Sequence, residues 1–156
     1  MKTLILFATK HGTAGEVAKR IAKNMNDADI HDLKELPLPS LSDYDCVVVG
    51  SSVYGGKIRK EAKAFLSKNP GMLCERNLGL YICGIAEQHE KEAFRTNFPS
   101  DILAAAKASY FLGGIYDPSQ FPRMERFIMK LLAGHSEYID SIDDDKIKEF
   151  TDILNG

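Results

Sequence analysis

The fold of this chain is decided by residues 4–16, Leu4-Ile5-Leu6-Phe7-Ala8 followed directly by Thr9-Lys10-His11-Gly12-Thr13-Ala14-Gly15-Glu16. The first five residues form an apolar run that is typical of a buried strand, and the polar segment after them is typical of a loop that opens a helix. The first amides of a helix have no internal partners, and the aligned peptide dipoles make that end partly positive, so a phosphate group is stabilised there. The sequence therefore predicts a phosphate site in the first loop, residues 9–14.

The side chains of the first loop allow two interpretations. Thr9 and Thr13 supply hydroxyl donors, and Gly12 lets the backbone come close to an anion and adopt a positive φ angle. Thr13 and Glu16 also have the spacing of a capping box, in which side chains satisfy the first helical amides without any ligand. These residues alone leave both interpretations open.

Length and charge limit the classes of protein to consider. The chain has 156 residues, which predicts one domain over residues 1–156. Its 20 basic and 22 acidic side chains give a formal net charge of −2. A chain this close to neutral has no positive field to gather a polyanion, which argues against a nucleic-acid partner.

The cysteines and the N-terminal residues indicate the cellular compartment in which we expect the protein. Cys46, Cys74 and Cys83 are odd in number and form no C-x-x-C pair, which argues against both a disulfide framework and a zinc site. The first apolar run is too short to cross a bilayer and lacks the pattern of a signal peptide. We therefore expect reduced thiols, no metal site and a cytoplasmic protein.

Apolar runs recur along the chain with the spacing of a parallel sheet. They cover residues 4–8, 46–49, 78–83 and 110–112, and residues 30–33 have the mixed character of an edge strand. The segments between them carry apolar stripes at helical spacing, with members at Val17, Ile21, Met25, Ile58, Ala62, Phe65, Leu66, Ile147, Phe150 and Leu154. Strands that alternate with helices predict a three-layer, doubly wound α/β fold with a five-stranded parallel sheet in the order 2-1-3-4-5.

The start of the last helix is marked by an acidic run. Ser141 and Asp144 have the spacing of a capping box, and Asp143 and Asp145 stand beside them. Carboxylates favour the positive end of a helix, so we interpret this run as capping.

Ligands in such folds bind beyond the carboxyl ends of the strands, which directs attention to two further loops. The second loop, residues 50–57, is Gly50-Ser51-Ser52-Val53-Tyr54-Gly55-Gly56-Lys57, and its one aromatic side chain can lie flat against a planar ligand. The alternative is a structural turn with an exposed tyrosine. The third loop, residues 83–89, begins small and apolar and can border one edge of a ring; Cys83 is most simply a buried strand residue, and His89 a solvated residue at a helix start.

Three segments together resemble a known family, the flavodoxin-like FMN proteins, and within it the branch that includes the menaquinone-dependent protoporphyrinogen IX dehydrogenases. They are residues 9–13, residues 50–58, and Gly113-Gly114 followed by residues 121–131. The resemblance covers essentially the whole chain. It implies a flavodoxin-like fold, bound FMN and an oxidoreductase whose flavin carries the chemistry, without a catalytic side chain.

The resemblance also implies which residues hold the FMN. Its phosphate is expected in the first loop, its ring against the second loop, and its other edge along the third. The expected residues are Thr9, Lys10, His11, Gly12, Thr13, Ala14, Ser51, Ser52, Val53, Tyr54, Gly55, Gly56, Cys83, Gly84, Ile85 and Ala86. Ala14 stands where the family usually has a second hydroxyl side chain, a loss of about 1 kcal/mol in phosphate binding. The protoporphyrinogen enzymes also carry a longer insertion before the Gly-Gly segment.

Other uses of the same sheet order fit less well. A phosphate-accepting receiver domain needs acidic residues after the first and third strands, where this chain has Thr-Lys-His and Ser-Ser. A small tyrosine phosphatase needs a cysteine and an arginine around the first loop. Two hypotheses about the function remain: a reductase that acts on a small-molecule substrate or a quinone, and a one-electron carrier of the flavodoxin type that serves a redox partner protein.

Residues 121–133 carry a separate signal. Their apolar members are Met124, Phe127, Ile128, Leu131 and Leu132, and their basic members are Arg123, Arg126 and Lys130. A helix with this pattern can lie on an anionic membrane surface, or it can dock on the core with a solvated basic face.

Overall fold

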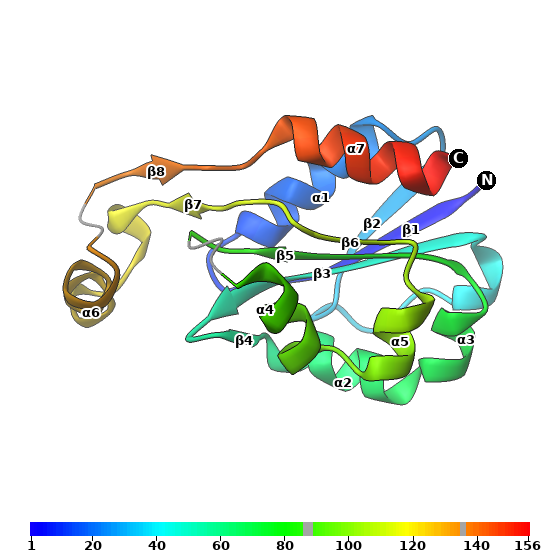
Figure 1. The fold of residues 1–156 in the computed structure, drawn as a ribbon, viewed down its shortest axis with the longest axis horizontal. Coiled ribbons are helices and arrows are strands. Elements are labelled where there is room, and N and C mark those ends of the chain that lie inside the picture. The colour runs from blue at the N-terminus through cyan, green and yellow to red at the C-terminus, as the bar shows by residue number, and fades with distance from the viewer. Residues whose placement is uncertain (86–88, 135–136) are drawn as a thin grey trace.

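A parallel sheet forms the centre of the computed structural model, which describes residues 1–85, 89–134 and 137–156 (Figure 1). The strands lie in the order β2-β1-β3-β5-β6, which confirms the predicted 2-1-3-4-5 arrangement. Their bounds are β1 Thr3–Ala8, β2 Ala28–Asp32, β3 Cys46–Tyr54, β5 Asn77–Cys83 and β6 Ala108–Phe111. The short β4, Lys57–Ile58, pairs antiparallel with the end of β3.

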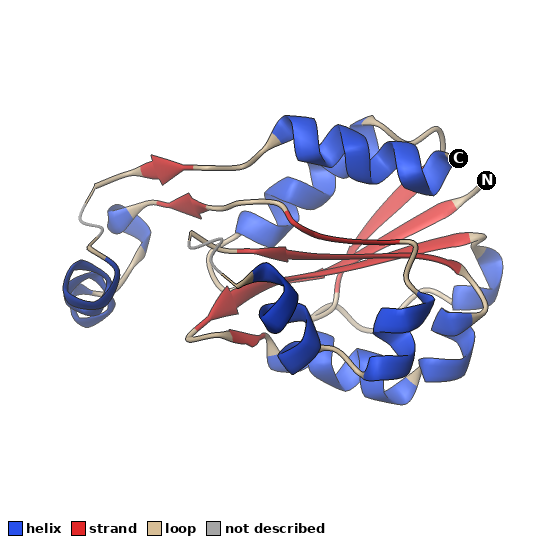
Figure 2. Cartoon of the chain, in the orientation of Figure 1, coloured by secondary structure: helices blue, strands red, loops and turns tan. Residues whose placement is uncertain are grey.

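Helices cover both faces of the sheet, as the apolar stripes predict (Figure 2). One face is covered by α1, Thr13–Lys23, and α7, Asp144–Asn155. The other is covered by α2 Lys60–Lys68, α3 Pro70–Cys74, α4 Glu90–Asn97 and α5 Ser100–Ala105. A short 3₁₀ turn, Leu41–Asp43, leads into β3.

The core is divided by the alternation of side chains along the strands. In β1, Leu4 and Leu6 belong to the cluster under α2 to α5, whereas Ile5 belongs to the cluster under α1 and α7. All three are fully buried. Both faces of the sheet are therefore apolar, the property of a parallel sheet enclosed between helices.

Two local predictions are corrected by the structure, the helical position of Ile58 and the capping box of Ser141, whereas the predicted capping by the acidic run is confirmed. Ile58 belongs to β4 and not to the helical stripe, because β3 continues to Tyr54 and turns back on itself before α2 begins at Lys60. The N-cap of α7 is Asp143, whose carboxylate accepts a hydrogen bond from the amide of Lys146 at 3.0 Å. Ser141 caps nothing, because its hydroxyl donates to the carbonyl of Gly114 at 3.1 Å.

Residues 113–143 leave the layered body in an excursion (Figure 1); the sequence predicted its helix, over residues 121–133, but not its two strands. Its two arms form a small antiparallel sheet from β7, Ile115–Tyr116, and β8, Ile139–Asp140. Between the arms lie a 3₁₀ turn, Pro118–Gln120, and α6, Arg123–Ala133. The excursion starts beside the carboxyl ends of the strands, next to the predicted site.

Candidate functional site

A cavity of about 620 Å³ lies where the carboxyl ends of β1, β3 and β5 meet. All three predicted loops contribute to its wall. The predicted residues that line it are Lys10, His11, Thr13, Ser52, Val53, Tyr54, Gly55, Gly56, Cys83, Gly84 and Ile85. Loops that are separate in the sequence thus converge on one space, at the position where ligands bind in doubly wound folds.

The first loop leads directly into α1. Gly12 is the N-cap, with φ of 91°, and its amide donates to Thr9 Oγ1 at 2.9 Å. No side chain of the described residues caps α1, so the capping box of Thr13 and Glu16 is not formed. The Thr13 hydroxyl instead points to the carbonyl of Ile115, 3.4 Å away. The first amides of α1 therefore keep their capacity to bind an anion.

Some predicted residues lie behind the cavity wall. Ser51 is buried, and its hydroxyl donates to the carbonyl of Ser52 and accepts from the amide of Arg59, both at 2.9 Å. Ala14 is buried as well, and its carbonyl accepts a hydrogen bond from the Tyr81 hydroxyl at 2.8 Å. These side chains hold the loops in place. Ala86 lies outside the described residues.

The second loop forms the tip of the β3–β4 hairpin. Gly55 and Gly56 both have positive φ angles, 60° and 78°, which suit the tight reversal between the two strands. Tyr54 lies at the cavity wall and is 36% exposed. Ser52 also lines the cavity, and its buried Oγ has no hydrogen-bond partner among the described residues. A buried hydroxyl without a partner is costly, so this atom is suited to a polar ligand.

The third loop contributes a small, apolar edge. Cys83 is fully buried, and burial raises the pKa of its thiol, which keeps it protonated. A protonated thiol is a poor nucleophile, which supports its interpretation as a strand residue. His89 is exposed at the start of α4, as expected.

A charged cluster at the cavity was missed by the sequence analysis. Glu125 of α6 forms an ion pair with Lys10, although 115 positions separate them. The hydrogen bond from Lys10, opposed by partial burial, lowers the pKa of the Glu125 carboxyl. No local pattern could have revealed this pair, because it depends on how the excursion folds back.

His11 takes part in the same cluster as a neutral imidazole. Its Nε2 is 3.5 Å from Glu125 Oε2, too far for a good hydrogen bond. Burial lowers the pKa of His11 and outweighs the opposing charge of Glu125. The imidazole ring also packs on Phe121, with 3.9 Å between the ring centroids. The side chains of His11 and Glu125 therefore pack against each other without forming a full ion pair.

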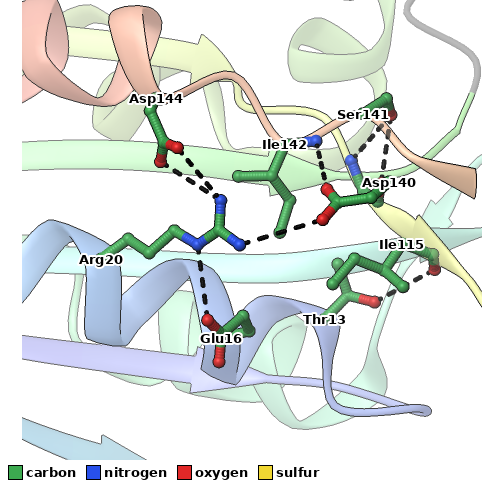
Figure 3. Close-up of polar contacts among 9 residues, drawn as sticks. Thr13, Glu16, Arg20, Ile115, Asp140, Ser141, Ile142 and Asp144 are labelled. Atoms are coloured by element: carbon green, nitrogen blue, oxygen red, sulfur yellow. Dashed lines mark hydrogen bonds and ion pairs between the residues drawn. The ribbon is translucent and has the colours of Figure 1, made fainter.

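The excursion is fastened to α1 on its other side (Figure 3). The guanidinium of Arg20 contacts Asp144 at 3.2 and 3.3 Å, Glu16 at 3.4 Å and Asp140 at 4.0 Å. Burial opposes its charge, but these carboxylates together raise the pKa of Arg20. Asp144 belongs to α7, so Arg20 joins α1 mainly to the start of that helix and reaches the β8 arm only through Asp140, while Thr13 contacts Ile115 of the β7 arm.

Comparison with known proteins identifies the family. The model of the flavodoxin domain matches residues 4–141, which is most of the chain. The chain belongs to the flavodoxin family. Among the curated relatives, the protoporphyrinogen IX dehydrogenase [quinone] of Escherichia coli (strain K12) is 30% identical over 102 residues. That alignment covers 62% of this chain and 56% of the relative, so the chain spans little more than half the length of this relative.

Solved flavodoxin structures share the fold. Oxidised Flavodoxin 2 from Bacillus cereus has a TM-score of 0.66 at 16% identity, over 99% of this chain and 98% of that one. A flavoprotein from Lactobacillus acidophilus NCFM, solved in complex with FMN, has a TM-score of 0.50 at 17% identity, over 72% of this chain and 90% of that one. At these identities the likeness concerns the fold alone.

Proposed function

We propose that this protein binds FMN in the 620 Å³ cavity and acts as a reductase that passes electrons between a small-molecule substrate and a quinone. The observation that carries the proposal is the convergence of the three loops on one cavity beside the free amides of α1. The unpaired Ser52 Oγ in the cavity wall supports it, since it offers a polar contact to a bound ring.

The residues divide the binding between phosphate and ring. The amides at the start of α1, with the hydroxyls of Thr9 and Thr13, hold the phosphate, and Gly12 leaves the approach open because no atom lies within 4 Å of where a Cβ would be. Tyr54 stacks on the ring. Lys10 Nζ lies 4.1 Å from the Tyr54 ring centroid, and this flexible side chain yields its place to a planar ligand.

Bound FMN supplies the redox chemistry, and the protein sets access to it. The excursion contributes Phe121, Ile128 and Met129 to the cavity wall. These apolar side chains exclude water and suit a hydrophobic reactant better than a polar protein surface. The quinone in the name of the Escherichia coli relative is consistent with such a reactant. We further propose a cytoplasmic setting, which suits the free cysteines.

The alternative function is a one-electron carrier for a redox partner protein. The fold is compatible with this alternative, because the flavodoxins from Bacillus cereus share it over nearly the whole chain. Stepwise reduction of the FMN-loaded protein without oxygen separates the two. We expect oxidised flavin to convert directly to the fully reduced form. Build-up of the long-wavelength absorbance of the one-electron state would favour the carrier instead.

Removal of the Tyr54 ring is expected to weaken FMN binding. Stacking on an aromatic ring contributes about 1–3 kcal/mol, so Tyr54→Ala should raise the dissociation constant by about 5- to 150-fold. Tyr54→Phe keeps the ring and serves as the control, with an expected change of less than about threefold, because only one hydroxyl is lost. Both constants can be measured from the quenching of flavin fluorescence. Equal constants for Tyr54→Ala and the unaltered protein would remove Tyr54 from the site.

A further inference from the structure

Helix α6 exposes apolar side chains that its own protein does not cover. It stands outside the layers of the fold, at the end of the excursion (Figure 1). The exposed fractions are 75% for Met124, 66% for Leu131, 61% for Phe127 and 39% for Ile128. At the helical spacing of 100° per residue these four side chains share one face. Of the two interpretations of residues 121–133, docking on the core therefore does not hold for these four side chains.

The basic and acidic side chains of α6 lie on different sides of the helix. Arg123, Arg126 and Lys130 are all exposed and flank the apolar face along one edge. The single carboxylate of the helix, Glu125, is turned inward to Lys10 and is 19% exposed. The outward side of α6 is thus apolar and positive, with no negative charge of its own.

We propose that α6 lies on an anionic lipid surface. The apolar face would enter the boundary between headgroups and acyl chains, and the basic edge would contact the headgroups. A second copy of this chain fits less well, because its own α6 would set another basic edge against Arg126 and Lys130. Within the described part of the chain, no helix is long and apolar enough to cross a bilayer.

The same helix forms part of the cavity wall. Ile128 and Met129 line the cavity from α6, so a lipid surface under this helix would adjoin the cavity. A lipid-soluble electron acceptor could then enter without crossing water. This consequence rests on the proposed function, whereas the binding of α6 to lipid does not.

Co-sedimentation with vesicles tests the proposal on the full chain. We expect binding to phosphatidylcholine vesicles that contain phosphatidylglycerol, and little binding to pure phosphatidylcholine or at high salt. Each basic residue near an anionic surface changes binding about fivefold, so R126E/K130E should lower the partition coefficient at least about 20-fold. F127S/L131S should abolish binding. The matched controls are K63E/K68E on α2 and M72S/I153S on α3 and α7, which alter exposed residues elsewhere and should bind like the unaltered protein.

A fluorescent reporter follows the insertion directly. The chain contains no tryptophan, so Phe127→Trp supplies a single probe on the apolar face. Its emission should shift to shorter wavelength with anionic vesicles, whereas the emission of Ile153→Trp on α7 should not. No shift, or binding that the α6 variants leave intact, would overturn the proposal. A dimer in sedimentation velocity that F127S/L131S dissociates would overturn it in favour of a second copy. FMN titration of the same variants tests the cofactor site separately.

Discussion

Gly50→Ala is expected to lower the free energy of unfolding by about 3 kcal/mol, at the upper end of what overpacking costs. Gly50 lies in β3 directly beside Tyr81 of β5. A Cβ at this position would come within 1.9 Å of the Tyr81 ring. The ring cannot move aside, because it is fully buried and its hydroxyl donates a hydrogen bond to the carbonyl of Ala14. Chemical denaturation followed by circular dichroism measures the loss.

The control for this substitution is Gly71→Ala in α3. No atom lies within 4 Å of the Cβ that it adds, and alanine is favoured in a helix by about 1 kcal/mol, so stability should hold or rise. Tyr81→Leu in the Gly50→Ala background should recover part of the loss by removing the ring. If Gly50→Ala lowers the free energy of unfolding no more than Gly71→Ala does, the Tyr81 ring does not pack directly against the backbone of β3 at Gly50.

The same contact connects the core to the candidate site. The Tyr81 hydroxyl binds the first turn of α1, whose amides we propose as the phosphate site. A displaced Tyr81 ring would release that turn. Gly50→Ala protein that remains folded at low temperature should therefore also bind FMN more weakly than the unaltered protein.

The central sheet was predictable because its signals are local. The strands β1, β3 and β5 are apolar runs that are buried on both faces, and β2 has the mixed pattern of an edge strand. Parallel strands also require crossovers of one hand, which leaves few possible orders. The loops after β1 and β3 were also predictable as ligand-binding loops, since glycines and hydroxyl side chains follow apolar runs there. The structure brings most of their residues to one cavity, as expected.

The excursion was not predictable, because long-range contacts place it. The ion pair of Lys10 with Glu125 joins segments 115 positions apart, and β7 and β8 are too short to leave a pattern. Ser51 shows the same limit within a loop. Its type suited a ligand contact, but the position of the Arg59 amide directs its hydroxyl away from the cavity. Residue type indicates what a side chain can bind, whereas tertiary structure decides what it does bind.

Gly113→Ala tests how the excursion leaves the sheet. Gly113 has φ of 84°, and a Cβ there would lie 1.9 Å from the carbonyl oxygen of Ser141. The obstacle is backbone, which cannot rotate away, so the two arms of the excursion must separate. We expect a loss of at least about 3 kcal/mol in unfolding free energy, from a left-handed backbone cost of about 1–2 kcal/mol and the steric overlap.

The matched substitution is Gly134→Ala, which separates the two causes. Gly134 also has a positive φ, 71°, but no atom lies within 4 Å of its added Cβ, so it should lose only the backbone cost of about 1–2 kcal/mol. Gly113→Ala should also weaken FMN binding, because the Gly113 carbonyl accepts a hydrogen bond from the amide of Gly84 in the cavity wall, at 3.0 Å. Equal losses for the two variants would mean that the arms yield freely at residue 141. The excursion would then be a loose attachment, and Gly113 would serve only its own turn.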